Sequence, residues 1–200
     1  MAVPRELPRL QLPIVSRRLL LRPPIPKDAA AIARALRDPR VSRPIGLPAR
    51  YSIHNAREFI GRSRKGRTEG TAYNLSIFLR ESGELIGGCG LDHILFDHRN
   101  AHVGYWIARP HWGNGYAPEA ASALITAGFR ELGLHRVHTG AFPDNHRSIR
   151  VLRRLGFRTE GRARQDRRVE GRYLDLVLFG LLRREFRPFH PPRGPRRIRS

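Results

Sequence analysis

A short segment with two glycines, residues 112–117, constrains the fold more than any other part of the chain. Residues 101–107 before it are apolar and aromatic, which predicts a strand. Residues 117–128 after it carry alanine, leucine and isoleucine at helical spacing. Pro118 suits the first turn of that helix, because the missing N–H of proline has no intrahelical partner to lose there. The sequence therefore predicts a strand, a tight glycine turn and a helix, in that order.

A turn of this kind can bind an anion. The first N–H groups of a helix have no intrahelical partner, and they point toward the positive end of the helix dipole. Phosphate groups are bound well by this arrangement. A side chain at Gly113 or Gly115 would keep a ligand away from the backbone, so glycine suits both positions. The segment therefore predicts a phosphate site.

Two common phosphate-binding loops do not fit this segment. The Walker loop ends in Gly-Lys-Ser/Thr, and no lysine follows Gly115. The dinucleotide-binding loop needs a third glycine where this chain has Pro118. The segment instead resembles the pyrophosphate loop of the GNAT (Gcn5-related) N-acetyltransferases, Gln/Arg-x-x-Gly-x-Gly/Ala, and most of all the RimJ/RimL branch of bacterial ribosomal-protein N-terminal acetyltransferases. Pro110 departs from the motif at its Gln/Arg position.

A second stretch, about thirty residues later, strengthens this resemblance. Residues 144–157 contain an apolar stripe at helical spacing, with Asn145 as a cap and Gly156 suited to the left-handed position after the helix. Asn-x-x-Ser, a helix and Leu-Gly-Phe are similar to the last helix of the RimJ/RimL branch. Both stretches stand in the order of that branch, and the resemblance covers about residues 17–186.

The remaining pattern predicts an α+β fold. Strands are expected at residues 17–22, 73–79, 85–91, 136–141 and 171–179, helices from Pro26 and over about 55–64, and a loop at 40–52. The strands at 73–79, 85–91 and 101–107 are expected to form an antiparallel meander that leads to the glycine turn. The resemblance implies a GNAT-like mixed, mostly antiparallel central sheet flanked by helices, whose splayed strands form an acyl-CoA cleft.

Two hundred residues suit one domain with a full core. We assign residues 1–15 to a leader, 16–186 to a single GNAT acetyltransferase domain, and 187–200 to a basic Pro/Arg-rich tail that is expected to be disordered. No apolar run reaches the length of a membrane span. The single cysteine, Cys89, fits a small buried residue in a reducing cytoplasm. No Cys/His cluster has zinc spacing, so no metal is expected.

Residues 183–200 contribute seven arginines and one glutamate, a charge of +6 out of the net +21. The remaining +15 is spread along the rest of the chain. Only two lysines accompany the arginines, a ratio that a biased genome produces without selection for function. A positive surface nevertheless attracts polyanions such as CoA, acidic proteins and RNA. Charge alone does not choose between these partners.

The resemblance implies that an amine attacks the thioester of acetyl-CoA directly, so that acetyl-CoA is the co-substrate and no covalent enzyme intermediate forms. The strand end before the glycine turn is expected to pair with the pantetheine arm like an added strand. The turn is expected to hold the pyrophosphate, and Asn145 either bonds the cofactor near its pantetheine or caps a helix. The expected cofactor-binding residues are Ile107, Ala108, Trp112, Gly113, Asn114, Gly115, Tyr116, Ala117 and Asn145.

The resemblance also implies catalytic residues. Many GNAT enzymes use a tyrosine of the last helix as general acid, and residues 145–157 contain none. In the RimL-like branch the proton donor to the leaving thiolate is the serine that corresponds to Ser148, whose alternative role is to stabilise the first helical turn. His102 is the expected general base, since imidazole titrates near neutral pH. Asp92 and His93 are alternatives, and the plainer interpretation of each histidine is a hydrogen-bonded or surface residue.

Three functions stay open from the sequence. The first is a cytoplasmic N-acetyltransferase, monomeric or homodimeric, that modifies a protein N-terminal amine of the ribosomal-protein-alanine type. The second modifies a small amine, such as an amino acid, a polyamine or an antibiotic; the shortage of carboxylates disfavours a cationic aminoglycoside. The third is a ribosome- or RNA-associated binding protein with a basic surface, although no aromatic RNA-reading motif is present.

Overall fold

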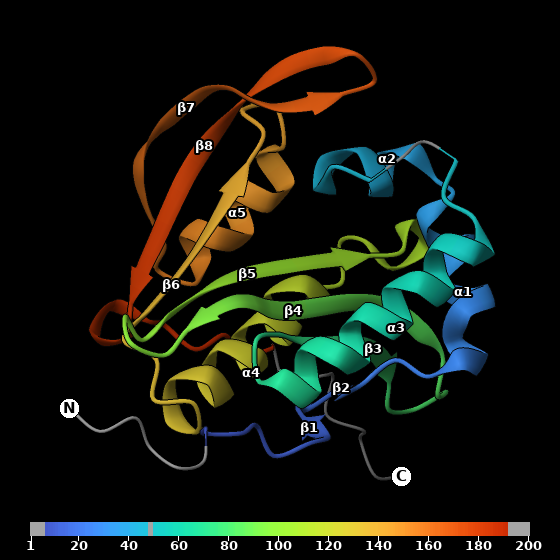
Figure 1. Cartoon of the computed structure of the whole chain (residues 1–200), viewed down its shortest axis with the longest axis horizontal. Coiled ribbons are helices and arrows are strands. Elements are labelled where there is room, and N and C mark those ends of the chain that lie inside the picture. Colours follow the sequence, from blue (N-terminus) through green and yellow to red (C-terminus); the bar gives the residue numbers. More distant parts are fainter. Residues whose placement is uncertain (1–6, 48–49, 192–200) are drawn as a thin grey trace, which may run out of the picture.

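The structure is a computed structural model that describes residues 7–47 and 50–191. One sheet runs through this part of the chain, with the strand order β1-β2-β3-β4-β5-β6-β8-β7 (Figure 1). Neighbouring strands are antiparallel except β5 and β6, which are parallel. The strands are β1 Ile14–Val15, β2 Leu19–Arg22, β3 Tyr73–Leu79, β4 Leu85–Leu95, β5 Asn100–Ile107, β6 Arg136–Ala141, β7 Arg158–Val169 and β8 Arg172–Leu182. The predicted mixed, mostly antiparallel sheet is confirmed.

Helices cover both faces of this sheet (Figure 1). They are α1 Ala29–Leu36, α2 Pro39–Ser42, α3 Ile53–Glu69, α4 Tyr116–Arg130 and α5 His146–Arg154, and a 3₁₀ turn, Arg43–Ile45, follows α2. The apolar stripe of α4, with Leu124 and Ile125, packs in the main core against Val103 of β5. On the other face, α1 and α3 form a smaller core that includes Ile32. None of the helices described is both long and apolar enough to span a membrane.

The helices begin and end at residues that suit these positions. The hydroxyl of Ser52 accepts the N–H of Asn55 at the start of α3, and Gly70 ends that helix in the left-handed region, with a φ of 76°. Asn145 caps α5 by accepting the N–H of Ser148, and Gly156 follows with a φ of 95°. The local prediction of the cap and of the left-handed glycine is therefore confirmed for α5.

Strands β5 and β6 separate after a very short pairing. They pair only over Asn100 to His102 and Arg136 to His138. Beyond that point β5 stays with β4, while β6 pairs along its length with β8, so the two halves of the sheet diverge (Figure 1). The predicted splayed strands are confirmed, and the resulting fork positions the candidate site.

The structure differs from the prediction in the basic segment before β8. No structure was predicted for residues 158–168, which form most of β7. Side chains along β7 are exposed or half-buried, so the segment lacks the apolar alternation that reveals a strand. Its backbone pairing with β8 holds it in place. The start of the loop expected at 40–52 is occupied by the end of α2 and by the 3₁₀ turn Arg43–Ile45, and the helix expected at 55–64 extends to Ile53–Glu69.

The ends of the chain are more ordered than the sequence predicted. Ile14 and Val15, assigned to the leader, form β1 against Leu20 and Leu21. Residues 187–191 of the predicted tail pack on the domain: the N–H of Phe189 donates to Ser122 Oγ at 2.8 Å. An aromatic anchor in an otherwise Pro/Arg-rich segment explains this difference. Residues 1–6 and 192–200 of these two predictions lie outside the described residues.

Candidate active site

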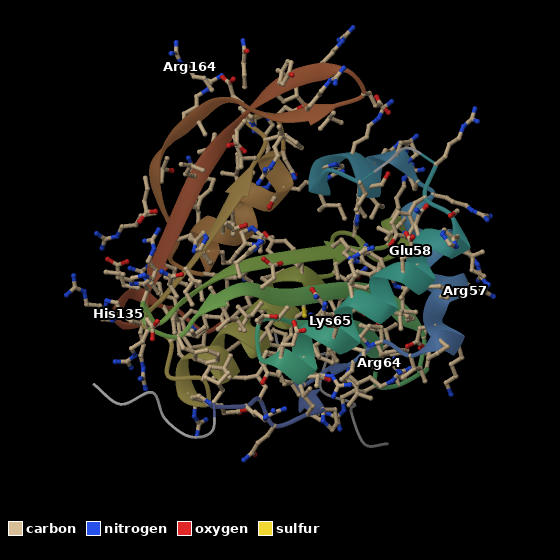
Figure 2. The ribbon with its side chains drawn as sticks, in the orientation of Figure 1. Arg57, Glu58, Arg64, Lys65, His135 and Arg164 are labelled. Atoms are coloured by element: carbon tan, nitrogen blue, oxygen red, sulfur yellow. The ribbon has the colours of Figure 1, made fainter. Side chains whose placement is uncertain are left out.

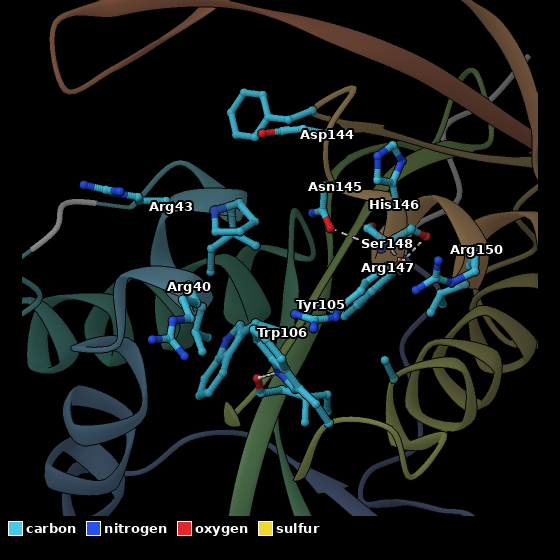
Figure 3. Close-up of a pocket in the computed structure, with 18 of the residues that line it drawn as sticks. Arg40, Arg43, Tyr105, Trp106, Asp144, Asn145, His146, Arg147, Ser148 and Arg150 are labelled. Carbon is cyan, nitrogen blue, oxygen red and sulfur yellow. Dashed lines mark hydrogen bonds between the residues drawn. The ribbon is translucent and has the colours of Figure 1, made fainter. Parts of the chain in front are cut away.

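The fork between β5 and β6 contains a cavity of about 1400 Å³ (Figure 3). The glycine turn lies at one end of it, and α5 forms one side. The opposite side is formed by α2 with its 3₁₀ turn and by the tip of the β7–β8 hairpin. Tyr105 and Trp106 of β5, with Asn145 and Ser148 at the start of α5, lie at the centre. The cavity therefore joins the predicted phosphate site to the predicted catalytic serine.

The glycine turn presents free backbone donors to the cavity. The N–H groups of residues 113–117 have no hydrogen-bond partner among the described residues. Gly113 and Gly115 have φ values of 84° and 74°, a region that residues with side chains rarely adopt. A Cβ at Gly113 would meet nothing within 4 Å, so that glycine serves the backbone conformation and leaves open space for a ligand. This is the geometry of an anion site at a helix N-terminus.

A buried carboxylate anchors this turn from below. Glu119, in the first turn of α4, is only 2% exposed and accepts hydrogen bonds from Ser16 Oγ at 2.9 Å and from the N–H of Arg18 at 2.9 Å. Its other oxygen accepts Arg18 Nε at 2.7 Å. The guanidinium of Arg18 then lies 4.6 Å from the ring centre of Tyr116, which opens the helix. The residues before β2 thus fix the start of α4.

The open edge of β5 differs in detail from the prediction. The N–H of Ala108 donates to the carbonyl of Ile86 at 2.8 Å, and the carbonyl of Ala108 accepts the N–H of His111 at 3.0 Å. The backbone of Ala108 is therefore used within the protein, which corrects its expected pairing with pantetheine. The carbonyl of Ile107 accepts Trp112 Nε1 at 2.6 Å. Because neighbouring residues of a strand face opposite sides, the N–H of Ile107 and the backbone of Tyr105 face the fork.

Ser148 and Tyr105 meet inside the cavity. Their hydroxyl oxygens are 3.0 Å apart, and the phenol also lies 3.4 Å from the carbonyl oxygen of Ser148 (Figure 3). Burial raises the pKa of the Tyr105 phenol, and the hydrogen bond with Ser148 offsets this only in part. The phenol therefore stays protonated at neutral pH. The role of Tyr105 was not predicted, because this residue lies 43 positions from Ser148 in the chain, although alternation along β5 places it on the same face as Val103 and Ile107.

The predicted general base does not line the cavity. His102 lies four residues before Trp106 on the same face of β5, and its Nδ1 is 3.0 Å from Asp92 Oδ1. The same carboxylate oxygen lies 2.7 Å from Nδ1 of His93. Burial alone would raise the pKa of Asp92, but hydrogen bonds with His102 and His93 outweigh it and lower that pKa. The structure thus gathers His102, Asp92 and His93 in one cluster, but does not bring them to Ser148.

The cavity wall is strongly positive. Arg147, Arg150 and Arg154 of α5 line one side, and the guanidinium of Arg147 lies 4.5 Å from the ring centre of Trp112. Arg40, Arg43 and Arg172 line the opposite side. Two carboxylates are present among the lining residues that the structure describes, Asp144 and Glu170. An anionic ligand such as CoA is favoured by this balance of charge.

Comparison with known proteins agrees with this geometry. Residues 18–158 match the family model described as Acetyltransferase (GNAT) domain. The chain is 35% identical to an uncharacterized N-acetyltransferase, p20, of Bacillus licheniformis, over 86% of this chain and 97% of that one. It is 30% identical to the [Ribosomal protein uS5]-alanine N-acetyltransferase of Escherichia coli, over 76% of this chain and 75% of the relative.

A solved structure shows the same fold. Mycobacterium smegmatis RimJ in complex with CoA-disulfide matches with a TM-score of 0.76 and 27% identity, over 84% of this chain and 83% of that one. The family model spans most of the domain, including the glycine turn and α5. The chain belongs to the GNAT family of N-acetyltransferases, with RimJ/RimL-type ribosomal-protein acetyltransferases among its relatives.

Proposed function

We propose that this protein transfers an acetyl group from acetyl-CoA to the N-terminal amine of a protein. The observation that carries the proposal is the set of free N–H groups at residues 113–117, which open into the fork beside Ser148. These donors suit the pyrophosphate of CoA. The pantetheine arm would then extend along the open edge of β5, where the N–H of Ile107 and the backbone of Tyr105 are its partners.

The reaction needs two proton movements. The amine nitrogen attacks the thioester carbon, the resulting tetrahedral species expels the CoA thiolate, and the thiolate takes a proton. In this proposal the hydroxyl of Ser148 supplies that proton, and its oxygen is reprotonated by the proton that the attacking nitrogen loses as the amide forms. The phenol of Tyr105, 3.0 Å away, donates its hydrogen bond to Ser148 Oγ and stabilises the oxygen as its proton leaves.

The attacking amine must be neutral. In the described part of the cavity wall, Asp144 is a carboxylate without an ion-pair partner, and it directly precedes Asn145. We assign to Asp144 the binding of the incoming ammonium group, whose excess proton passes to the carboxylate or to water. His102 has no role in deprotonating the ammonium group in this proposal, because it lies outside the cavity wall.

A protein N-terminus is the acceptor that the relatives favour. The Escherichia coli relative is named for the alanine of ribosomal protein uS5, and the similar solved structure is a RimJ. Ribosome association through the basic surface belongs to the same proposal. A polyamine is less suited, because the arginines of the cavity wall would repel it.

An acetyl-transfer assay tests the proposal. Purified protein is incubated with acetyl-CoA and a panel of peptides with free N-termini, and the peptides are weighed by mass spectrometry. We expect a gain of one acetyl group at the N-terminal amine. Gly113→Glu should abolish transfer by filling the open space at the anion site, whereas Gly83→Glu, at another positive-φ glycine with nothing within 4 Å of its Cβ position, should retain it. Transfer to small amines alone would contradict the proposed acceptor.

A further inference from the structure

We propose that the preferred acceptor is a peptide whose N-terminal amine is followed within a few residues by acidic side chains. This inference rests on the proposed function and names the class of acceptor for the same site. It comes from the charges on the side of the cavity that faces away from α5. That side, here called the acceptor wall, consists of residues 40–45 of α2 and its 3₁₀ turn and residues 169–174 of the β7–β8 hairpin.

Two arginines of the acceptor wall are free to bind an anion. The guanidinium groups of Arg40 and Arg172 line the cavity, and neither has an ion-pair or hydrogen-bond partner among the described residues. Both side chains are exposed. Arg40 and Trp106 both line the cavity (Figure 3). Guanidinium groups at such positions bind carboxylates in a bidentate geometry.

The single carboxylate that the structure describes on the acceptor wall is already neutralised. Glu170 Oε2 lies 2.8 Å from Arg43 Nη2, and Glu170 Oε1 accepts Arg43 Nε at 3.0 Å. This bidentate pair leaves Glu170 little capacity to attract a cationic acceptor. The net charge of the acceptor wall therefore comes from Arg40 and Arg172.

The pair between Arg43 and Glu170 also limits how an acceptor enters. It joins the segment after α2 to the tip of the β7–β8 hairpin, two parts of the chain that approach each other above the fork in Figure 1. The two sides of the opening are thus connected. A chain end enters such an opening more easily than a folded loop with an internal lysine does.

The positions of the charges match one kind of acceptor. The ammonium group of a peptide would meet Asp144 beside Asn145, and its following residues would pass the acceptor wall. Acidic side chains there would meet Arg40 and Arg172, whereas lysines or arginines would meet like charges. The acceptor wall therefore selects acceptor peptides by the residues that follow the acetylated amine.

Three peptides with the same N-terminal alanine test the inference. Their residues 2–4 are Glu-Asp-Glu, Gln-Asn-Gln or Lys-Arg-Lys, and kcat and KM for acetylation are measured with saturating acetyl-CoA. We expect kcat/KM to fall in that order, with about tenfold between the first and last peptides, mainly through KM, because partly exposed charge pairs contribute modestly. Raising the ionic strength should reduce the difference.

Matched variants show whether the acceptor wall causes the preference. Arg40→Gln and Arg172→Gln should each reduce the acidic-to-basic ratio about threefold. Arg64→Gln removes the same charge from the exposed face of α3 (Figure 2) and should leave the ratio unchanged. Equal rates for the three peptides, or an equal effect of Arg64→Gln, would overturn the inference and leave the proposed function standing. Failure to acetylate any peptide would overturn both.

Discussion

The phenolic oxygen of Tyr105 lies 3.0 Å from the hydroxyl oxygen of Ser148, and this contact connects β5 to the start of α5 inside the cavity. The N–H of Ser148 is held by Asn145 at 3.2 Å, so the serine is fixed from two sides. A serine held in this way can hand its proton to a leaving group without first reorienting. The geometry therefore gives the proton donor both a position and a supporting hydrogen bond.

Replacement of Ser148 should affect turnover and not cofactor binding. For Ser148→Ala we expect kcat to fall about 10²-fold, the usual size of a general-acid contribution, with an unchanged Kd for CoA in calorimetry. Tyr105→Phe should cause a smaller loss of kcat, and the double variant should be no slower than Ser148→Ala, because the phenol acts through the serine. Full turnover of Ser148→Ala would remove this residue from the mechanism.

The same contact predicts a pH dependence. Burial raises the pKa of Tyr105 above that of a free phenol, so the group remains a hydrogen-bond donor where an exposed tyrosine ionises. The decrease in kcat on Tyr105→Phe substitution should therefore keep the same size from pH 7 to about pH 10. A decrease that disappears below about pH 9 would show that the phenol ionises early.

Variants of two arginines on α5 distinguish the effect of a charge that lines the cavity from the effect of the overall charge of the helix on CoA binding. Arg150 lines the cavity and Arg153 does not, although both lie on α5. We expect Arg150→Gln to raise the Kd of CoA about threefold to tenfold in a salt-dependent manner, because it removes a cation near the phosphates. Arg153→Gln should leave the Kd unchanged. Equal effects of the two variants would show that only the overall charge of the helix matters.

Variants of Asp144 and of His102 distinguish which of the two side chains binds the amine of the acceptor. Asp144→Asn should raise the KM of a peptide acceptor about tenfold or more, since it removes the partner of the ammonium group. His102→Gln should change kcat/KM by less than about twofold, because His102 bonds Asp92 and lies outside the cavity wall. The reverse order, with a lost acidic limb of the pH profile in His102→Gln, would restore His102 as the base.

The buried carboxylate below the glycine turn predicts a loss of stability. Glu119→Ala leaves the N–H and the guanidinium of Arg18 without their partner, so we expect the free energy of unfolding to fall by about 2–4 kcal/mol. Glu69→Ala, which removes an exposed carboxylate 3.8 Å from Lys65, should cost less than about 0.5 kcal/mol. Urea denaturation of both variants measures the difference, and similar losses would contradict the anchoring role of Glu119.

The sequence predicted the parts of the site that depend on neighbouring residues. The glycine turn, the proline in the first turn of α4 and the cap at Asn145 each involve contacts within a few positions, and local propensity determines them. The glycines of β4 allow close packing within the sheet, since a Cβ at Gly88 would lie 2.6 Å from the indole nitrogen of Trp106.

The parts that the sequence did not predict depend on residues far apart in the chain. Arg18 and Glu119 are 101 positions apart, and Arg43 and Glu170 are 127 apart. No local pattern pairs such residues when arginines are common throughout the chain. Strand β7 was missed because its side chains are polar on both faces, so its backbone pairing with β8 left no trace in the apolar pattern.

In the proposed mechanism, the free N–H groups of residues 113–117 hold the pyrophosphate of acetyl-CoA. Amide NMR of ¹⁵N-labelled protein, titrated with CoA and separately with pantetheine, tests it most directly, since pantetheine lacks the pyrophosphate. We expect downfield shifts of these amide protons with CoA and none of that size with pantetheine. Saturation with CoA that leaves these amides unmoved would contradict it.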